Sequence, residues 1–178
     1  MEEETKKIAG EVVIPEKVSK QVKEEIRHIL AYKELLEKSF SKTATKIVEI
    51  LLAGSFYLDA SDIHIEPKEE FARLRIRIDG VLHDVLNFDL KIYQLLLSRI
   101  KLLAGLKLNV TTRPQDGRFS ILIENESVEV RASSLPSEYG ETIVLRILNP
   151  KWVVSIEELG LRPDLKDLFE YEIKIFPR

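Results

Sequence analysis

The chain has 178 residues, and its 27 Lys and Arg against 30 Asp and Glu give a formal net charge of −3. Hydrophobic residues make up 44% and charged residues 32%, which is typical of a globular chain and argues against wholesale disorder. The absence of cysteine excludes a disulfide framework, a thiolate zinc site and a cysteine nucleophile, and three histidines leave little for a histidine-rich metal site. No apolar run approaches the roughly 20 residues of a membrane span, and the N-terminus is acidic, unlike a secretory signal, so we expect a cytoplasmic protein.

A helical segment is predicted from Glu16 to Ser39, and residues 1–15 before it show no clear hydrophobic periodicity. Its apolar positions form a narrow stripe that Lys33 interrupts: Val18, Val22, Ile26, Ile29 and Leu36. A narrow stripe gives a helix little stability of its own. We therefore predict that residues 1–40 form a weakly held helical arm or linker and that residues 41–178 form the main domain.

Three more helices are predicted along the rest of the chain. The first covers 43–59 and has one apolar face with helical spacing. The second covers 90–104, follows the capping residue Asp89 and is apolar on several faces, so we expect it to be the most buried helix. A short helix at 163–171 begins with proline.

Alternation of apolar and polar residues predicts the strands. They are expected at 62–66, 73–78, 81–86, 118–123, 128–133 and 142–148. Asp79-Gly80 is a two-residue hairpin signal, and we expect a loop around Pro136 and Gly140. Hairpins rather than crossovers link most strands, which predicts an α+β fold: a mainly antiparallel sheet of about six strands with helices packed on it and a helical arm before it.

No sequence motif for catalysis is present. The phosphate-binding loop G-x-x-x-x-G-K-[ST] is missing, as are G-x-G-x-x-G, G-x-S-x-G and H-E-x-x-H. The chain by itself therefore shows no catalytic residues.

Asp62, His64 and Glu66 share one face of a predicted strand. Two carboxylates and an imidazole could hold a metal or transfer a proton. A polar strand face, with His64 hydrogen-bonded to an arginine of the next strand, explains the pattern equally simply. We favour this second interpretation, because no further metal ligand is indicated.

Arg73, Arg75 and Arg77 share a face of the next predicted strand. They could contact nucleic-acid phosphates, or they could pair with Asp62, Glu66 and other carboxylates across the sheet. Aromatic residues do not alternate with these arginines, and the net charge is negative, so we favour the ion pairs.

Three further arginines lie in or beside the later strands. Arg118 ends the turn 113–118, in which Pro and Gly restrict the backbone and Asp116 can close an Asx-type turn. Arg131 and Arg146 are the basic residues of otherwise apolar or weakly polar strand segments, where a guanidinium can bind a phosphate in a bidentate manner. An ion pair with Glu129 or Glu141 is the structural alternative.

Five segments in this order resemble one protein family. They are ASDIHIEP at 60–67, RIRIDGVL at 75–82, RIK at 99–101, PQDGR at 114–118 and PSEYGETIVLRIL at 136–148. The resemblance is to the second N-terminal domain of the secretion ATPases, which comprise protein E of type II secretion and the type IV pilus assembly ATPase. It covers about residues 43–171.

The resemblance implies that this domain is followed by a RecA-like domain, which carries the phosphate-binding loop. It implies a hexamer on the cytoplasmic face of the bacterial inner membrane, in contact with the inner-membrane platform of the machine, with ATP and Mg²⁺ bound between the two domains. It implies that Arg131 and Arg146, with Arg118 at the same edge, reach the nucleotide phosphates. No catalytic residue, metal site, cofactor or nucleic-acid partner is implied for this chain alone.

Two departures from the family pattern stand out. The family usually has an acidic or basic residue ahead of the PQDGR turn, and this chain has Thr111-Thr112-Arg113 there. The sequence also stops where the family continues into its ATPase domain, which is expected of either a fragment or a truncated paralogue. The leading interpretation is a non-catalytic, nucleotide-clamping domain of a motor. A self-sufficient hydrolase and a nucleic-acid-binding module that uses Arg73, Arg75 and Arg77 are the alternatives.

Overall fold

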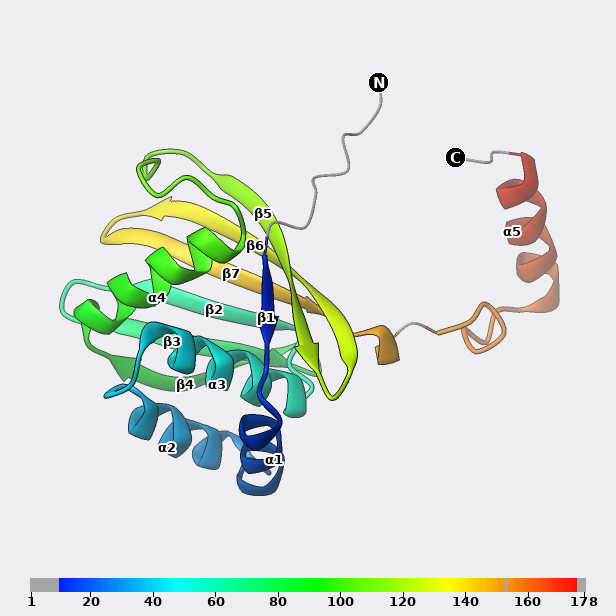
Figure 1. Ribbon diagram of the computed structural model, residues 1–178. Helices are drawn as coiled ribbons and strands as arrows, with labels where there is room; N and C mark the ends of the chain where they lie inside the picture. The colour runs from blue at the N-terminus through cyan, green and yellow to red at the C-terminus, as the bar shows by residue number, and fades with distance from the viewer. Residues whose placement is uncertain (1–9, 153, 176–178) are drawn as a thin grey trace. The chain divides into compact units, whose positions relative to one another are not determined.

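A seven-stranded sheet organises the computed structural model, which describes residues 10–152 and 154–175 (Figure 1). The strands, in spatial order, are β1 (Glu11–Val13), β5 (Gln115–Ile123), β6 (Glu126–Ser137), β7 (Gly140–Leu148), β2 (Asp62–Pro67), β3 (Ala72–Ile78) and β4 (Val81–Phe88). All neighbours pair in antiparallel fashion except β1, which runs parallel to β5. The α+β class is confirmed, with seven strands rather than about six, since β1 is too short to show a period.

The helices are α1 (Glu16–Glu25), α2 (Ile29–Ser39), α3 (Ala44–Tyr57), α4 (Leu90–Leu103) and α5 (Pro163–Ile175), with a short 3₁₀ helix, η1 (Pro150–Trp152). Thr43 and Asp89 cap α3 and α4, each accepting a hydrogen bond from a backbone amide. The prediction that the helix at 90–104 is the most buried is wrong. Nearly all of α3 from Ile47 to Phe56 is buried, whereas Leu95 and Leu102 of α4 are exposed.

The segment predicted as one helix from Glu16 to Ser39 is two helices. Ile26 has an extended backbone, and Nδ1 of His28 accepts a hydrogen bond from the amide of Ala31 at the start of α2. Each helix has its own buried face. A single helical period applied to residues 16–39 detects only part of the two faces, so the predicted apolar stripe is narrower than the surface that the two helices bury together.

The two helices belong to the hydrophobic core, so the expectation of a weakly held arm is wrong for the described residues. Val22, Tyr32 and Leu36 are almost completely buried, and the Tyr32 hydroxyl donates a hydrogen bond of 2.8 Å to the carbonyl of Leu51 in α3. A Cβ atom at Gly54 would lie 2.3 Å from the Tyr32 ring, which explains the glycine within α3. Compact packing continues from these helices to Leu148, so it does not follow the predicted division at residue 40.

Replacing Leu36 by alanine should lower the free energy of unfolding by about 2–5 kcal/mol, because a buried leucine leaves a cavity when truncated. Leu30→Ala in the same helix is the matched control, since Leu30 is 68% exposed. Urea unfolding of both variants measures the difference. Equal, small losses for the two variants would show that α2 is not part of the core.

The strands meet in tight hairpins. Asp79 and Gly80 both have positive φ, as do Glu124 and Asn125, which is the backbone of the two-residue turns that fit the twist of a sheet. The expected loop around Pro136 and Gly140 is instead a third hairpin, in which Ser137 pairs with Gly140. The strands on either side of it are longer than predicted for that reason.

A second unit begins at Asn149 and contains η1 and α5. The predicted helix from Pro163 is confirmed and runs on to Ile175. Its apolar side chains, among them Leu168, Phe169 and Ile173, are about half exposed.

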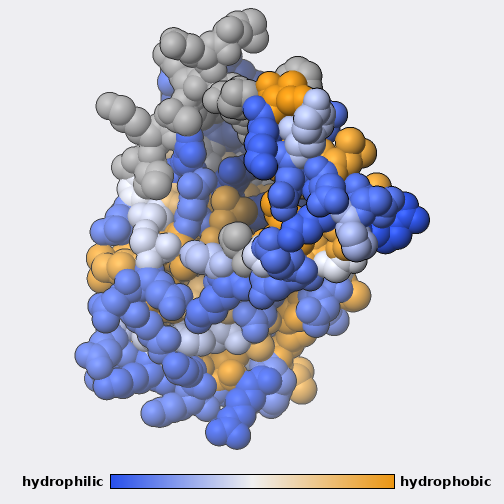
Figure 2. Space-filling model, turned by 90° about the vertical axis from the view of Figure 1, so that its right-hand side faces the viewer, coloured by the Kyte–Doolittle hydropathy of each residue, from blue (hydrophilic) through white to orange (hydrophobic). Residues whose placement is uncertain are grey.

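The face of the molecule drawn in Figure 2 is mostly hydrophilic, with hydrophobic side chains in separate patches. Within the described ranges, no helix has the length and the apolar character that a membrane span requires.

Candidate functional site

The two faces of the sheet differ in character. Alternate residues such as Ile63, Ile65, Phe119 and Ile143 are buried beneath α3 and α4, which lie across this face in Figure 1. The intervening residues are mainly charged or polar, with a few apolar side chains such as Val144 and Leu148 among them. None of the helices described up to Leu148 covers them, so we call this second surface the open face.

The register places the three predicted arginines side by side on the open face. Arg118 lies directly opposite Arg131, Arg131 opposite Arg146, and Arg146 opposite Asp62. Asp62 in turn lies opposite Arg77. These five residues form a straight line across β5, β6, β7, β2 and β3, which we call the arginine row.

Asp62 lies between two arginines of this row. Its Oδ1 accepts a hydrogen bond of 2.9 Å from Nε of Arg146, and its Oδ2 lies 3.3 Å from Nε of Arg77. The Ser61 hydroxyl donates a further hydrogen bond to Oδ2. Burial raises the pKa of Asp62, but the hydrogen bonds from Arg146 and Ser61 and the positive charge of Arg77 outweigh it, so that the net pKa is lowered. The carboxylate is therefore charged at neutral pH.

Glu129, two residues before Arg131 on β6, contacts the other two arginines from beside the row, at longer distances. Its Oε1 lies 3.5 Å from Nε of Arg131 and 3.7 Å from Nη1 of Arg118. Of the alternatives open from the sequence, the pair of Arg131 with Glu129 is present. Arg146 pairs with Asp62 instead of Glu129 or Glu141.

Exposure separates the arginines into two kinds. The side chains of Arg131 and Arg146 are 65% and 63% exposed, whereas those of Arg118 and Arg77 are 24% and 36% exposed. Arg131 and Arg146, on adjacent strands, thus present two guanidinium groups to solvent. Such a pair can bind a phosphate by charge and by parallel hydrogen bonds.

The carboxylates near His64 are engaged with arginines. Arg75 forms a short ion pair with Glu66, and Arg77 pairs with Asp62, as the favoured interpretation predicted. The predicted hydrogen bond between His64 and an arginine is not found among the described residues, where Nε2 of His64 is buried without a partner. Burial lowers the pKa of His64, so the imidazole is neutral at pH 7. Across the described ranges, no three potential metal ligands gather in one place.

The PQDGR segment is not the predicted turn, because Gln115, Asp116 and Gly117 already belong to β5. Gln115 binds the backbone of Lys107 and Val110 through its side-chain amide, and Asp116 accepts a hydrogen bond from Ser133 on β6. A Cβ atom at Gly117 would lie 2.1 Å from the carbonyl oxygen of Ala104. The glycine thus permits close approach to the end of α4, and the motif places Arg118 at the start of the row.

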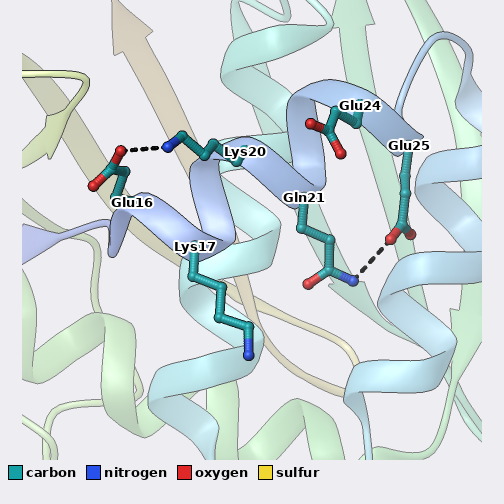
Figure 3. Close-up of a pocket in the computed structure, with 6 residues that line it drawn as sticks. All are labelled: Glu16, Lys17, Lys20, Gln21, Glu24 and Glu25. Carbon is teal, nitrogen blue, oxygen red and sulfur yellow. Dashed lines mark hydrogen bonds and ion pairs between the residues drawn. The ribbon is translucent and has the colours of Figure 1, made fainter.

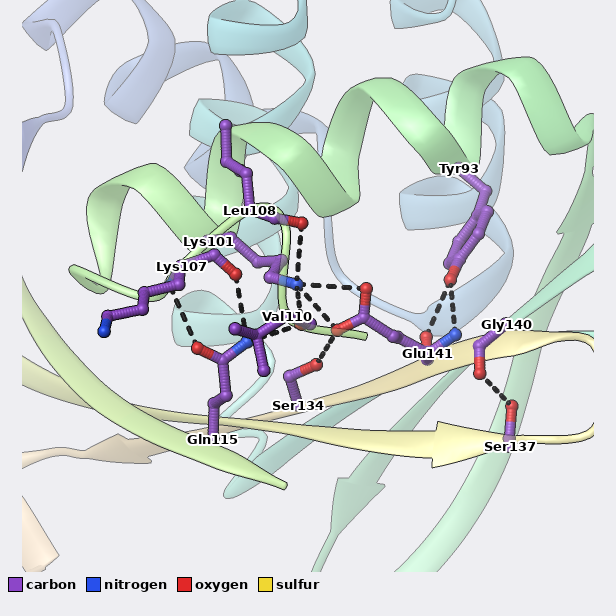
Figure 4. Close-up of polar contacts among 10 residues, drawn as sticks. All are labelled: Tyr93, Lys101, Lys107, Leu108, Val110, Gln115, Ser134, Ser137, Gly140 and Glu141. Atoms are coloured by element: carbon purple, nitrogen blue, oxygen red, sulfur yellow. Dashed lines mark hydrogen bonds and ion pairs between the residues drawn. The ribbon is translucent and has the colours of Figure 1, made fainter. Parts of the chain in front are cut away.

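A buried ion pair on the helix-covered side was not predicted (Figure 4). Nζ of Lys101 lies 2.7 Å from Oε1 of Glu141, and both side chains are at most 5% exposed. Ser134 donates a hydrogen bond to the same carboxylate, and the Lys101 ammonium also donates to the carbonyl of Val110. The Tyr93 hydroxyl and the Glu141 backbone bond to each other. Two signals were available in the sequence: Lys101 lies in an apolar helix, and Lys101 and Glu141 belong to two of the family segments. Neither signal predicts a buried pair, because lysine is exposed in most proteins.

A shallow hollow over α1 is lined by six side chains of that helix alone (Figure 3): Glu16, Lys17, Lys20, Gln21, Glu24 and Glu25. Glu16 pairs with Lys20 and Gln21 with Glu25. With one exposed helix face as its lining, the hollow has no convergent polar groups of the kind that bind a ligand.

Comparison with known proteins gives one consistent result. Residues 37–175 match the family of type II/IV secretion system proteins. Type II secretion system protein E of Klebsiella pneumoniae is 38% identical over 133 residues, which are 74% of this chain and 27% of that protein. The type IV pilus assembly ATPase TfpB of Acinetobacter baylyi is 39% identical over 117 residues, which are 65% and 20% of the two chains. The chain thus spans about a quarter of the length of these curated relatives. The solved structure of the Legionella pneumophila ATPase DotB matches 71% of this chain with a TM-score of 0.41 and 18% identity.

Proposed function

Because this chain belongs to the type II/IV secretion system protein family, we propose that it forms a non-catalytic domain of a bacterial secretion or pilus-assembly motor. In this proposal it supplies arginines to ATP that is bound, with Mg²⁺, on an adjoining RecA-like ATPase domain. The motor is a hexamer at the cytoplasmic face of the inner membrane, where it contacts the membrane platform of the machine.

The observation that carries the proposal is the pair of exposed guanidinium groups of Arg131 and Arg146 on adjacent strands. Rigid strands fix the backbone of both residues before any ligand arrives. A phosphate on a neighbouring domain meets them when the domains close, and their charge then stabilises the transferred phosphoryl group. Arg118 lies next in the row and contributes positive charge at the edge of the site.

The partner domain is inferred from two further facts. The relatives are about four times as long as the matched segment, and the sequence contains no phosphate-binding loop. The half-exposed apolar side chains of α5 are of the kind that pack against another domain. The nucleic-acid alternative has less support, because Arg75 and Arg77 are paired with carboxylates and are only 29% and 36% exposed, about half as much as Arg131 and Arg146.

ATP hydrolysis tests the proposal. The chain alone should release phosphate no faster than a buffer control, because its sequence contains no phosphate-binding loop that would hold Mg²⁺ and a γ-phosphate together. Residues 10–175, which include the core helices α1 and α2, placed in the Klebsiella pneumoniae protein in exchange for the corresponding segment should support turnover that the same protein lacks when the segment is deleted. We call this protein the chimera. Equal turnover with and without the segment would rule out the proposed role.

A further inference from the structure

We propose that Asp62 is a positioning residue, which holds the guanidinium of Arg146 by its Nε so that both Nη nitrogens face an incoming phosphate. The part of this inference that concerns ATP rests on the function proposed above. The part that concerns the orientation of Arg146 rests on this chain alone.

The geometry singles out Asp62 among the carboxylates of the open face. Its side chain is only 6% exposed, while the Arg146 side chain that it binds is 63% exposed. Both carboxylate oxygens are used, Oδ1 by Arg146 and Oδ2 by Ser61 and Arg77. A buried, fully bonded carboxylate cannot move with its partner, so it serves as a fixed anchor.

The atom that Asp62 binds determines what remains free on Arg146. A guanidinium has five N–H donors, one on Nε and four on the two Nη nitrogens. The bond to Asp62 uses the Nε donor and leaves the planar Nη pair, which matches two oxygens of a phosphate. Fixing the side chain before binding removes part of the entropy loss that a mobile arginine would suffer.

Arg131 provides the contrast within the same row. Its partner Glu129 is 29% exposed and contacts Nε at 3.5 Å, at the limit of a hydrogen bond. Arg131 is therefore held loosely and can adjust to the ligand. The row thus combines one fixed arginine, Arg146, with one adaptable arginine, Arg131.

The orientation of Arg146 can be measured on the chain as it is. In ¹⁵N NMR spectra of the arginine side chains, the Nε–H of Arg146 should exchange slowly with water, and its signal is assigned by its loss in Arg146→Lys. Asp62→Asn should accelerate this exchange severalfold, because a neutral amide binds the guanidinium more weakly. Glu129→Gln is the control and should leave the Arg146 signal unchanged. Fast exchange in the unmodified chain, or no change in Asp62→Asn, would overturn the proposed orientation.

The chimera tests the consequence for ATP. Asp62→Asn should lower kcat by up to about 10²-fold with little change in KM, as expected when a catalytic group is misplaced by about 1 Å. In a chimera that already carries Arg146→Ala, Asp62→Asn should lower kcat no further, because Asp62 acts only by orienting the guanidinium that Arg146→Ala has removed. Independent, multiplying losses would show that Asp62 acts structurally. If Arg146→Ala alone leaves kcat unchanged, the proposed function fails, while the exchange measurement still decides the orientation.

Discussion

Replacing Arg131 or Arg146 by alanine in the chimera should lower ATP turnover by on the order of 10³-fold, while the KM for ATP changes little. An arginine that meets developing phosphate charge is worth about 10³–10⁵-fold in rate when it is the main electrophile. Two arginines on adjacent strands share this role here, so each single loss should fall at or below the lower end of that range.

Lysine should rescue turnover poorly at either position. Its compact ammonium lacks the planar fork that binds two phosphate oxygens. At position 146 it also lacks an Nε–H that could bind Asp62 while other donors face the phosphate. Arg146→Lys should therefore be impaired more than Arg131→Lys.

Arg162→Ala is a matched control for these variants. Arg162 is an exposed arginine paired with a carboxylate two residues away, Asp164, as Arg131 is paired with Glu129. Its loss should leave turnover near that of the unmodified chimera. Thermal melts of this chain with Arg131→Ala and Arg146→Ala complete the control. Arg131 pairs with the partly exposed Glu129 and should contribute little to folding. Arg146→Ala takes one partner from the buried Asp62, which keeps Ser61 and Arg77. A melt that falls by many degrees, with normal turnover per folded molecule, would show that the two arginines are structural.

Replacing Lys101 by methionine should lower the free energy of unfolding by about 3–5 kcal/mol, because it leaves Glu141 buried without its cation. Removing both charges in Lys101→Met with Glu141→Gln should be less damaging than the single change. The buried site then holds no unpaired charge, and Ser134 can still bond to the glutamine. Urea unfolding of the single and double variants measures the difference.

Lys46→Met is the control for the buried pair. Lys46 forms an ion pair with Glu49 one turn along α3, and its side chain is 37% exposed. Its partner Glu49 is 13% exposed, so the pair is less buried than that of Lys101 and Glu141, and surface pairs within a helix contribute about 0.3–0.5 kcal/mol. If Lys101→Met were no more harmful than Lys46→Met, the buried pair would not stabilise the fold.

The loop before β5 depends on the same buried pair. Lys101 binds the carbonyl of Val110, and Gln115 binds the backbone of both Lys107 and Val110. These contacts fix the chain that leads into Arg118. The helix-covered side of the sheet thus supports the geometry of the open face.

Local patterns in the sequence were sufficient for most of the elements. Alternation in β2 and β3, the Asp79-Gly80 turn between β3 and β4, and the cap Asp89 depend on residues close together in the chain. The same local rules failed at residues 16–39, where the break at Ile26 shifts the phase of the helix period. They failed again at the β6–β7 hairpin, where Pro136 and Gly140 predict a loop.

The candidate site shows what a sequence alone determines about this protein. Arg118, Arg131 and Arg146 could be named because each is a charged side chain in a strand-forming segment, a property of the residue and its immediate neighbours. Their alignment in one row, and the choice of Asp62 rather than Glu141 as the partner of Arg146, depend on the register between β2 and β7, which lie about 80 residues apart. Packing of the whole core sets that register, since a slip of one residue would turn every buried isoleucine of β2 to the open face. The burial of Lys101 was decided in the same way, because only the folded chain brings a carboxylate, a serine and a carbonyl oxygen to its ammonium.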